Sequence, residues 1–188
     1  MLLLAPLVTY YARNLPHWQP PGQDIFITWR LYGSLPACFN IPEQENSVAK
    51  RFRHYDRFLD AAAAGPLWLQ DARVAGCVIA ALQRGHDQKM FRLNAYVLMA
   101  NHVHVLIEPR SSLAQITKRM KGSSAREANQ ILRRSNARFW QAESFDHWIR
   151  TPQEWQRVRT YILENPVKAG LVKRPGQWPW SSASHPIE

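Results

Sequence analysis

The stretch FRLNAYVLMANHVHVLIE, residues 91–108, decides the fold of this chain. Two runs of β-branched, aromatic and aliphatic residues flank a short turn at residues 100–101. This spacing predicts a β-hairpin, because successive side chains of a strand alternate between the two faces of a sheet. Val103, Val105 and Ile107 then share one face and pack into the core.

The segments around this hairpin alternate between strand-like and helix-like composition. The expected order is a strand, two helices, the hairpin, a long helix, an edge strand and a last helix. An antiparallel sheet backed by helices satisfies this order, so we predict an α+β fold of the ferredoxin-like type. A parallel doubly wound fold suits it less well. Outside the hairpin, the expected segments are residues 24–32, 47–64, 71–84, 113–134, 145–149 and 151 onward.

The last helix has a clear start signal. Thr151 and Glu154 have the spacing of a capping box, and Pro152 occupies the first helical position. Asn165-Pro166 is expected to end or kink the helix, because proline disfavours helical geometry in the residue before it.

A chain of 188 residues suits one domain of ordinary size. We expect residues 1–12 to be a flexible leader, residues 13–174 to form the domain, and residues 175–188 to be a C-terminal tail. The two cysteines have no CxxC spacing, which argues against a zinc knuckle or a disulfide framework. The apolar start is too short for a membrane span and lacks the basic residues of a secretion signal, so we expect a cytoplasmic protein with no membrane partner.

The net charge of +10 and the pI of about 10.1 favour a polyanionic partner, nucleic acid first and an anionic membrane surface second. Eight tryptophans beside many arginines also suit unstacked bases, although they equally suit a core. A solvated helix face is the simple explanation for any single basic residue. The excess of bases over acids instead favours a phosphate-binding track, for which we single out Arg30, Lys118, Arg119, Lys121, Arg126, Arg133, Arg134, Arg150 and Lys168.

His102 and His104 share the second face of the hairpin, about 6.6 Å apart along the strand. Two imidazoles at this spacing can converge on one ion such as Mn²⁺ or Mg²⁺, or they can simply be polar residues of a half-exposed strand. Tyr161 and Asn165 lie one turn apart on the last helix. A phenol beside a metal can attack a phosphate, and the amide oxygen can complete the metal shell. Spacing alone equally allows Tyr161 to be a core aromatic.

At these residues the sequence resembles a known family. YVLMANHVHVLIEP (96–109) is similar to the metal-binding strand of the HUH single-strand nucleases, and YILENPVKAGLV (161–172) resembles the tyrosine helix of the REP-associated tyrosine transposases. Further similar motifs are LPHW (15–18), FITWRLYGSLP (26–36), GPLWL (65–69), FW with FDHWIR (139–150), and WPWSS (178–182). Their order covers nearly the whole chain from about residue 13.

The resemblance implies the HUH nuclease fold, with Tyr161 as nucleophile and Mg²⁺ or Mn²⁺ held by His102 and His104. Asn165 matches the position of the third ligand, where relatives often have glutamine. The implied reaction cleaves and rejoins single-stranded DNA through a 5′-phosphotyrosine, on hairpins from repetitive extragenic palindromes, in the bacterial cytoplasm at the nucleoid. A monomer is favoured and a homodimer is allowed.

Two other functions compete with this interpretation. The same fold can bind hairpin DNA or RNA without cutting it, because a ferredoxin-like sheet with exposed aromatics suits RNA. Two histidines, a tyrosine and an amide together are more than such a binding protein needs. A metal-dependent hydrolase of small phosphoesters is the third reading, but a small substrate does not require the long basic helix.

Overall fold

The computed structural model describes residues 9–12, 16–19, 22–36, 39 and 48–187. Its centre is a four-stranded sheet in the order β4-β5-β3-β6, and each neighbouring pair is antiparallel. The strands are β3 (Ile25–Arg30), β4 (Phe91–Leu98), β5 (His102–Pro109) and β6 (Phe145–Trp148). The predicted hairpin is therefore confirmed as β4 and β5, and β3 pairs with β5 at the centre of the sheet.

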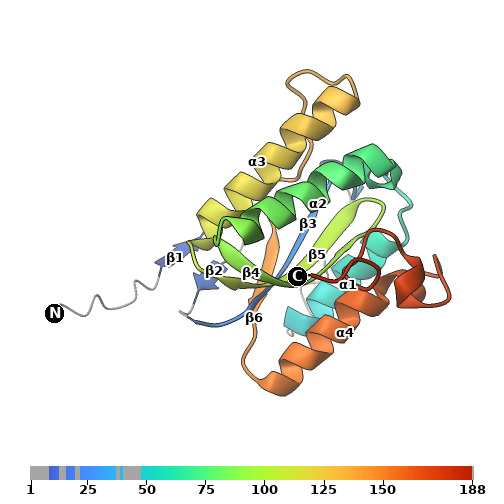
Figure 1. Cartoon of the computed structure of the whole chain (residues 1–188). Helices are drawn as coiled ribbons and strands as arrows, with labels where there is room; N and C mark the ends of the chain where they lie inside the picture. Colours follow the sequence, from blue (N-terminus) through green and yellow to red (C-terminus); the bar gives the residue numbers. More distant parts are fainter. Residues whose placement is uncertain (1–8, 13–15, 20–21, 37–38, 40–47, 188) are drawn as a thin grey trace.

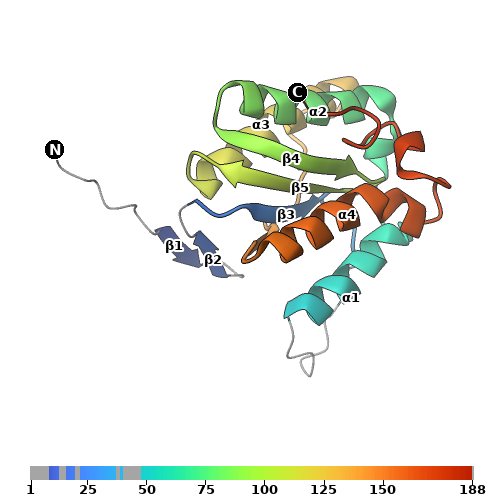
Figure 2. The ribbon, with the colours of Figure 1, turned by 60° about the horizontal axis from the view of Figure 1, so that its bottom comes forward.

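Helices cover both faces of this sheet (Figures 1 and 2). On one face lie α2 (Ala72–Asp87) and α3 (Leu113–Ile131), and on the other lie α1 (Val48–Asp60) and α4 (Pro152–Lys168). Each face has its own hydrophobic core. The expected α+β arrangement of an antiparallel sheet flanked by helices is confirmed.

Alternation along the central strands supplies both cores. Ile27 of β3 and Val103 and Val105 of β5 pack toward α2 and α3. Phe26 of β3 and Leu106 of β5 pack toward α1 and α4. Because neighbouring residues point to opposite faces, His102 and His104 are directed to the face covered by α1 and α4.

The start of α4 is as predicted, and of the two outcomes expected at Asn165-Pro166, an end or a kink, the structure excludes the end. Thr151 Oγ1 accepts a hydrogen bond from the backbone N–H of Glu154 at 3.1 Å. The helix continues through Pro166 to Lys168, instead of ending at Asn165. Gly170, at φ +72°, then caps it, and its N–H donates to the carbonyl of Val167 at 3.0 Å.

The C-terminal segment lies along the outer edge of β4. It passes through a short 3-10 turn, η2 (Pro175–Gln177), and then runs beside the strand. The N–H of Leu98 donates to the carbonyl of Trp180 at 2.8 Å, and the N–H of Ser182 donates to that of Tyr96 at 3.0 Å. These bonds cover an edge strand that would otherwise expose unpaired backbone groups.

The N-terminal region contains structure that sequence analysis did not anticipate. β1 (Thr9–Ala12) and β2 (Pro16–Gln19) pair as a separate antiparallel two-stranded sheet. The expected leader, residues 1–12, therefore includes a strand. Its residues 1–8 lie outside the described residues, and their flexibility stays a prediction. A short 3-10 turn, η1 (Trp68–Gln70), precedes α2. None of the helices among the described residues is both long and apolar enough to cross a bilayer.

Two glycines of α2 provide a test of how closely this helix packs on the sheet. A Cβ at Gly85 would lie 2.4 Å from Cε1 of the fully buried Phe91, whereas a Cβ at Gly76 would meet nothing within 4 Å. We expect Gly85→Ala to lower the free energy of unfolding by about 1–3 kcal/mol through overpacking. Gly76→Ala is expected to raise it by about 0.5–1 kcal/mol, because alanine favours helix. Urea denaturation measures both, and equal shifts would contradict the packing of α2 on Phe91.

Candidate active site

Two fully buried imidazoles form the centre of the site. His102 and His104 are the first and third residues of β5, and both rings project to the face covered by α1 and α4. Their Nε2 atoms lie 3.1 Å apart. The structure therefore brings the pair together as expected, but in a buried site and not on a half-exposed strand.

Hydrogen bonds to the other ring nitrogens fix this orientation. The Nδ1 of His102 lies 2.7 Å from Asn101 Oδ1, and the Nδ1 of His104 lies 2.7 Å from Thr28 Oγ1. When these oxygens accept the Nδ1 protons, both Nε2 atoms carry lone pairs and face each other. Burial and the neighbouring His104 lower the pKa of His102 to about 3, so its ring is neutral at physiological pH. Two lone pairs at 3.1 Å repel each other unless a cation lies between them.

Two carboxylates of α1 face the same point. Asp56 Oδ1 lies 3.3 Å from Nε2 of His104 and 3.9 Å from Nε2 of His102. Asp60, one turn further on, places its Oδ1 3.5 Å from Nε2 of His102. Asp56, His102 and His104 form a possible metal-binding triad, in which one donor atom from each lies within 4.8 Å of the others. Imidazole nitrogens with a carboxylate oxygen are a donor set that suits a divalent ion.

The protonation of these carboxylates follows from their surroundings. Burial raises the pKa of Asp60 to about 7, helped by the negative charge of Asp56. Burial also acts to raise the pKa of Asp56, but the nearby His104, His102 and Lys168 together outweigh it, and the pKa is lower than usual. The carboxylate nearest to the histidines is thus held in the charged form that a metal ligand requires.

The last helix contributes the tyrosine and the amide. The Tyr161 ring centroid lies 5.6 Å from that of His104, and the ring meets Phe26 and Phe52 edge-on at 6.1 Å each. Asn165 is 1% exposed, and its Nδ2 lies 3.5 Å from Nε2 of His104. A half-turn of the amide exchanges its nitrogen and oxygen and turns the oxygen toward the histidines. Helix α4 therefore brings both residues beside the pair, within one chain.

The site holds an unusual group of buried polar atoms without a hydrogen-bond partner. Natural proteins satisfy almost all such atoms, because leaving one unpaired costs about 1–3 kcal/mol. Here several lie around the two Nε2 atoms, and most of them carry lone pairs and no proton. They are Asp56 Oδ1, Asp60 Oδ1, Asn165 Oδ1 and the Tyr161 hydroxyl. This set fits a divalent cation and a phosphate group better than it fits a structural core.

Asp56 and Asp60 were missed by sequence analysis, although the sequence contains a signal for them. Helix α1 presents Phe52, Asp56 and Leu59 to the protein interior, and both Asp56 and Leu59 are buried. A carboxylate on the apolar stripe of an amphipathic helix is almost never left unpaired. Two aspartates spaced by four on that stripe should have suggested a ligand pair.

Two of the basic residues singled out in the sequence, Lys168 and Arg30, lie near the histidine pair, and a third, Arg133, is exposed beyond the end of α3. Lys168 places its Nζ 5.1 Å from the Tyr161 ring centroid, and also 3.7 Å from a Glu164 oxygen. Arg30 lies opposite His102 in the β3–β5 register, and its guanidinium donates to Ser34 Oγ at 3.3 Å. Arg133 follows α3 and is exposed, with a left-handed backbone at φ +52°.

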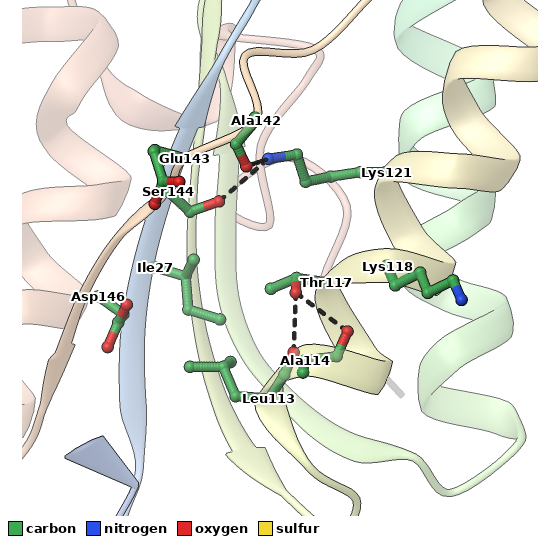
Figure 3. A pocket seen from close by; sticks show the side chains of 10 residues that line it. All are labelled: Ile27, Leu113, Ala114, Thr117, Lys118, Lys121, Ala142, Glu143, Ser144 and Asp146. Atoms are coloured by element: carbon green, nitrogen blue, oxygen red, sulfur yellow. Dashed lines mark hydrogen bonds between the residues drawn. The ribbon is translucent and has the colours of Figure 1, made fainter. Parts of the chain in front are cut away.

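Three others have structural contacts. Arg134 stacks on Trp68 with its guanidinium carbon 3.8 Å from the ring centroid, and Arg150 lies 4.9 Å from the Trp148 ring. Lys121 donates to the carbonyls of residues 141 and 142 at 2.6 and 2.8 Å, and to Ser144 Oγ at 3.2 Å. Lys121 thereby anchors the segment before β6, at one wall of a pocket of about 300 Å³ (Figure 3). This pocket also includes Ile27, so it lies on the sheet face away from the histidines.

The remaining three, Lys118, Arg119 and Arg126, are exposed on α3. They lie on the sheet face opposite the histidines. The basic residues therefore do not form one continuous track.

Comparison with known proteins identifies the family of this chain. The family model described as "Transposase IS200 like" matches residues 69–165, just over half of the chain. A REP-associated tyrosine transposase of Escherichia coli (strain K12) is 26% identical over 92 residues, which cover 49% of this chain and 54% of the relative. The chain thus spans about half the length of this curated relative.

A solved structure of a REP-associated tyrosine transposase bound to a REP hairpin has the same fold. The TM-score is 0.58 at 18% identity, over 93% of this chain and 84% of the other. At this identity the likeness concerns the fold alone. The family match includes both histidines, Tyr161 and Asn165. The chain belongs to the IS200-like transposase family.

Proposed function

We propose that this protein cleaves and rejoins single-stranded DNA beside a hairpin, through a covalent phosphotyrosine at Tyr161. One observation carries the proposal. The Tyr161 hydroxyl is buried without a hydrogen-bond partner, and its ring lies 5.6 Å from that of a histidine in the possible metal triad. A core tyrosine normally finds a partner for its hydroxyl. A nucleophile that meets its phosphate only in the complex has no such need.

The step exchanges one phosphate ester for another. The Tyr161 oxygen forms a bond to phosphorus, and the bond from phosphorus to the 3′ oxygen of the preceding nucleotide breaks. The phenol loses a proton and the departing 3′ hydroxyl gains one. The 5′ end of the downstream strand stays attached to the tyrosine, and attack by a 3′ hydroxyl reverses the step and rejoins DNA.

His102, His104 and Asp56 would hold Mg²⁺ or Mn²⁺, and Asn165 stands beside them as a further ligand. When bound, such an ion polarises phosphoryl oxygens and stabilises the leaving oxygen. Thr28 and Asn101 contact the Nδ1 atoms of the two histidines and so orient both Nε2 atoms toward the ion site. The Lys168 ammonium, 5.1 Å from the Tyr161 ring centroid, would attract the phosphate that approaches the tyrosine.

The proposed substrate is hairpin DNA of the repetitive extragenic palindrome type, encountered on the bacterial chromosome in the cytoplasm. Its support is the curated relative named as a REP-associated tyrosine transposase, together with the net charge of +10. Non-catalytic binding of the same hairpin is the alternative. It offers no reason for a buried hydroxyl without a partner beside a possible metal triad.

The first prediction concerns the nucleophile. Tyr161→Phe is expected to abolish the denaturant-resistant adduct that forms with labelled hairpin DNA and Mn²⁺, a loss of at least about 10³-fold. Its thermal stability should stay the same or rise slightly, because the hydroxyl has no partner to lose.

Tyr96→Phe is the matched control, since Tyr96 is 4% exposed and packs toward α2 and α3, away from the histidines. It should still form the adduct. An adduct that persists in Tyr161→Phe would exclude this residue as the nucleophile. Binding without an adduct in the unsubstituted protein would favour the non-catalytic alternative.

The second prediction separates the candidate ligands. Asp56→Asn and His102→Ala should each weaken Mn²⁺ binding at least about tenfold in titration calorimetry, because even changes outside the ligand shell have effects of that size. His102→Ala should also abolish metal-dependent cleavage. Asp87→Asn is the control, because Asp87 is exposed on α2. Unchanged Mn²⁺ affinity in Asp56→Asn, with a loss in Asn165→Ala, would assign the third ligand to α4 and not to α1.

The third prediction concerns subunits. The Tyr161 ring lies 5.6 Å from that of His104 within one chain, and we therefore expect an active site that is complete in a monomer. Mixing Tyr161→Phe with His102→Ala should therefore restore no adduct at any ratio. A restored adduct in the mixture would demonstrate that one subunit supplies the tyrosine and its partner supplies the metal site.

A further inference from the structure

A second basic surface lies at the end of the sheet remote from the histidines. It is an open groove of about 790 Å³ between the first half of α3 and the turn that joins α2 to β4. Its cations are Lys118, Arg119 and Arg126, and all three are exposed. The groove is completed by Gln88, Met90, Ser111, Gln115, Gly122 and Ser123.

The chemistry of this lining suits phosphate groups. None of the nine lining residues is acidic, and the side-chain amides of Gln88 and Gln115 can donate hydrogen bonds. No salt bridge or cation–π contact occupies Lys118, Arg119 or Arg126 among the described residues. Lys121 and Arg134 of the same region already have structural partners, as shown above. The three groove cations thus remain available to a polyanion.

The helix also presents a gap at the middle of the groove. Gln115, Lys118, Gly122 and Arg126 follow one another at spacings of three and four, so they form a single stripe on α3. A Cβ at Gly122 would meet nothing within 4 Å, so no packing contact requires glycine there. Glycine inside a helix costs about 1 kcal/mol relative to alanine. The missing side chain lets a backbone of another molecule approach α3 between two cations.

The groove and the metal triad are far apart. His102 begins β5, and Pro109 ends it two residues before Ser111 of the groove. Seven residue steps at about 3.3 Å each span about 23 Å. In a duplex, in which successive base pairs are about 3.4 Å apart, this length corresponds to about 7 base pairs. The groove therefore lies well beyond the phosphate that Tyr161 would attack.

From this geometry we propose that the α3 groove binds the sugar-phosphate backbone of the hairpin stem, about 7 base pairs from the cleavage point. This inference rests on the proposed function, which identifies the duplex as the stem of a DNA hairpin. It adds a second contact between protein and DNA, which forms only when the stem is long enough to reach the groove. Cleavage chemistry occurs at the start of β5, and the stem is held beyond its end. A hairpin with a stem too short to reach the groove loses this contact.

The test measures binding in EDTA, where no cleavage intervenes. Fluorescein-labelled DNA hairpins with one fixed 5′ single-stranded extension carry stems of about 4, 8 and 12 base pairs. Affinity of the unsubstituted protein should rise severalfold from the shortest stem to the middle one and little thereafter. Lys118→Gln/Arg119→Gln/Arg126→Gln should remove this rise. It should also reduce the slope of log Kd against log salt for the longer stems by about 2 to 3.

Two controls separate the groove from net charge and from misfolding. Arg157→Gln/Arg159→Gln/Lys173→Gln removes the same charge from exposed positions on and after α4, and should keep the dependence on stem length. Gly122→Gln keeps every charge and favours helix, so it should not lower thermal stability. It should nevertheless weaken binding of the longer stems severalfold, because its side chain fills the groove.

Full affinity of Gly122→Gln for the longer stems would overturn the proposal. Equal losses in the two triple variants, or an affinity of the unsubstituted protein that does not depend on stem length, would overturn it as well. The proposed nuclease function is judged separately by the Tyr161 adduct. If the adduct forms but affinity does not depend on stem length, the nuclease function stands and the groove contact is excluded. If affinity depends on stem length but no adduct forms, the groove contact stands and the nuclease function is excluded.

Discussion

The pairing of β3 with β5 is the constraint on which the site depends. Its register places Thr28 opposite His104 and Arg30 opposite His102. Thr28 therefore reaches Nδ1 of His104 at 2.7 Å and turns Nε2 toward the other histidine. A slip of one residue would move both histidines to the face of α2 and α3, where Val103 and Val105 now pack. The hydrophobic alternation of β5 makes such a slip costly, so the same residues that build the core also fix the site.

Burial gives this site its chemical character. Two imidazoles, two carboxyl groups and an amide are enclosed by Phe26, Phe52 and the rest of the α1 and α4 core. In such an environment an unpaired hydrogen-bond acceptor destabilises the fold, and a bound cation would interact with several of these acceptors at once. The arrangement therefore suits a bound divalent ion. Strain of this kind is typical of sites whose polar groups meet their partners only in the complex.

The sequence predicts the elements of this fold well, because each one is encoded locally. Alternation assigned His102 and His104 to one face, and a capping box located the start of α4 at Thr151. The features that the sequence did not reveal are contacts between segments that are far apart in the chain. Asp56 reaches the histidines only because α1 packs beside α4 under the sheet, and no local pattern gives that arrangement. Lys121 looked like a phosphate contact, but its ammonium is directed to carbonyl oxygens about twenty residues further on.

Helix α4 shows how a departure from local preference serves the site. Proline normally disfavours helical geometry in the residue before it, so the helix was expected to end or kink near Asn165. Ile162, Asn165 and Pro166 are all buried, however, and packing of this stretch holds it helical to Lys168. Lys168 is seven residues from Tyr161, two turns along the same stripe, and this continuity places its Nζ 5.1 Å from the tyrosine ring. A helix that ended at Asn165 would separate the cation from the hydroxyl. The unfavourable proline is thus compatible with function because tertiary packing, and not local preference, sets where this helix ends.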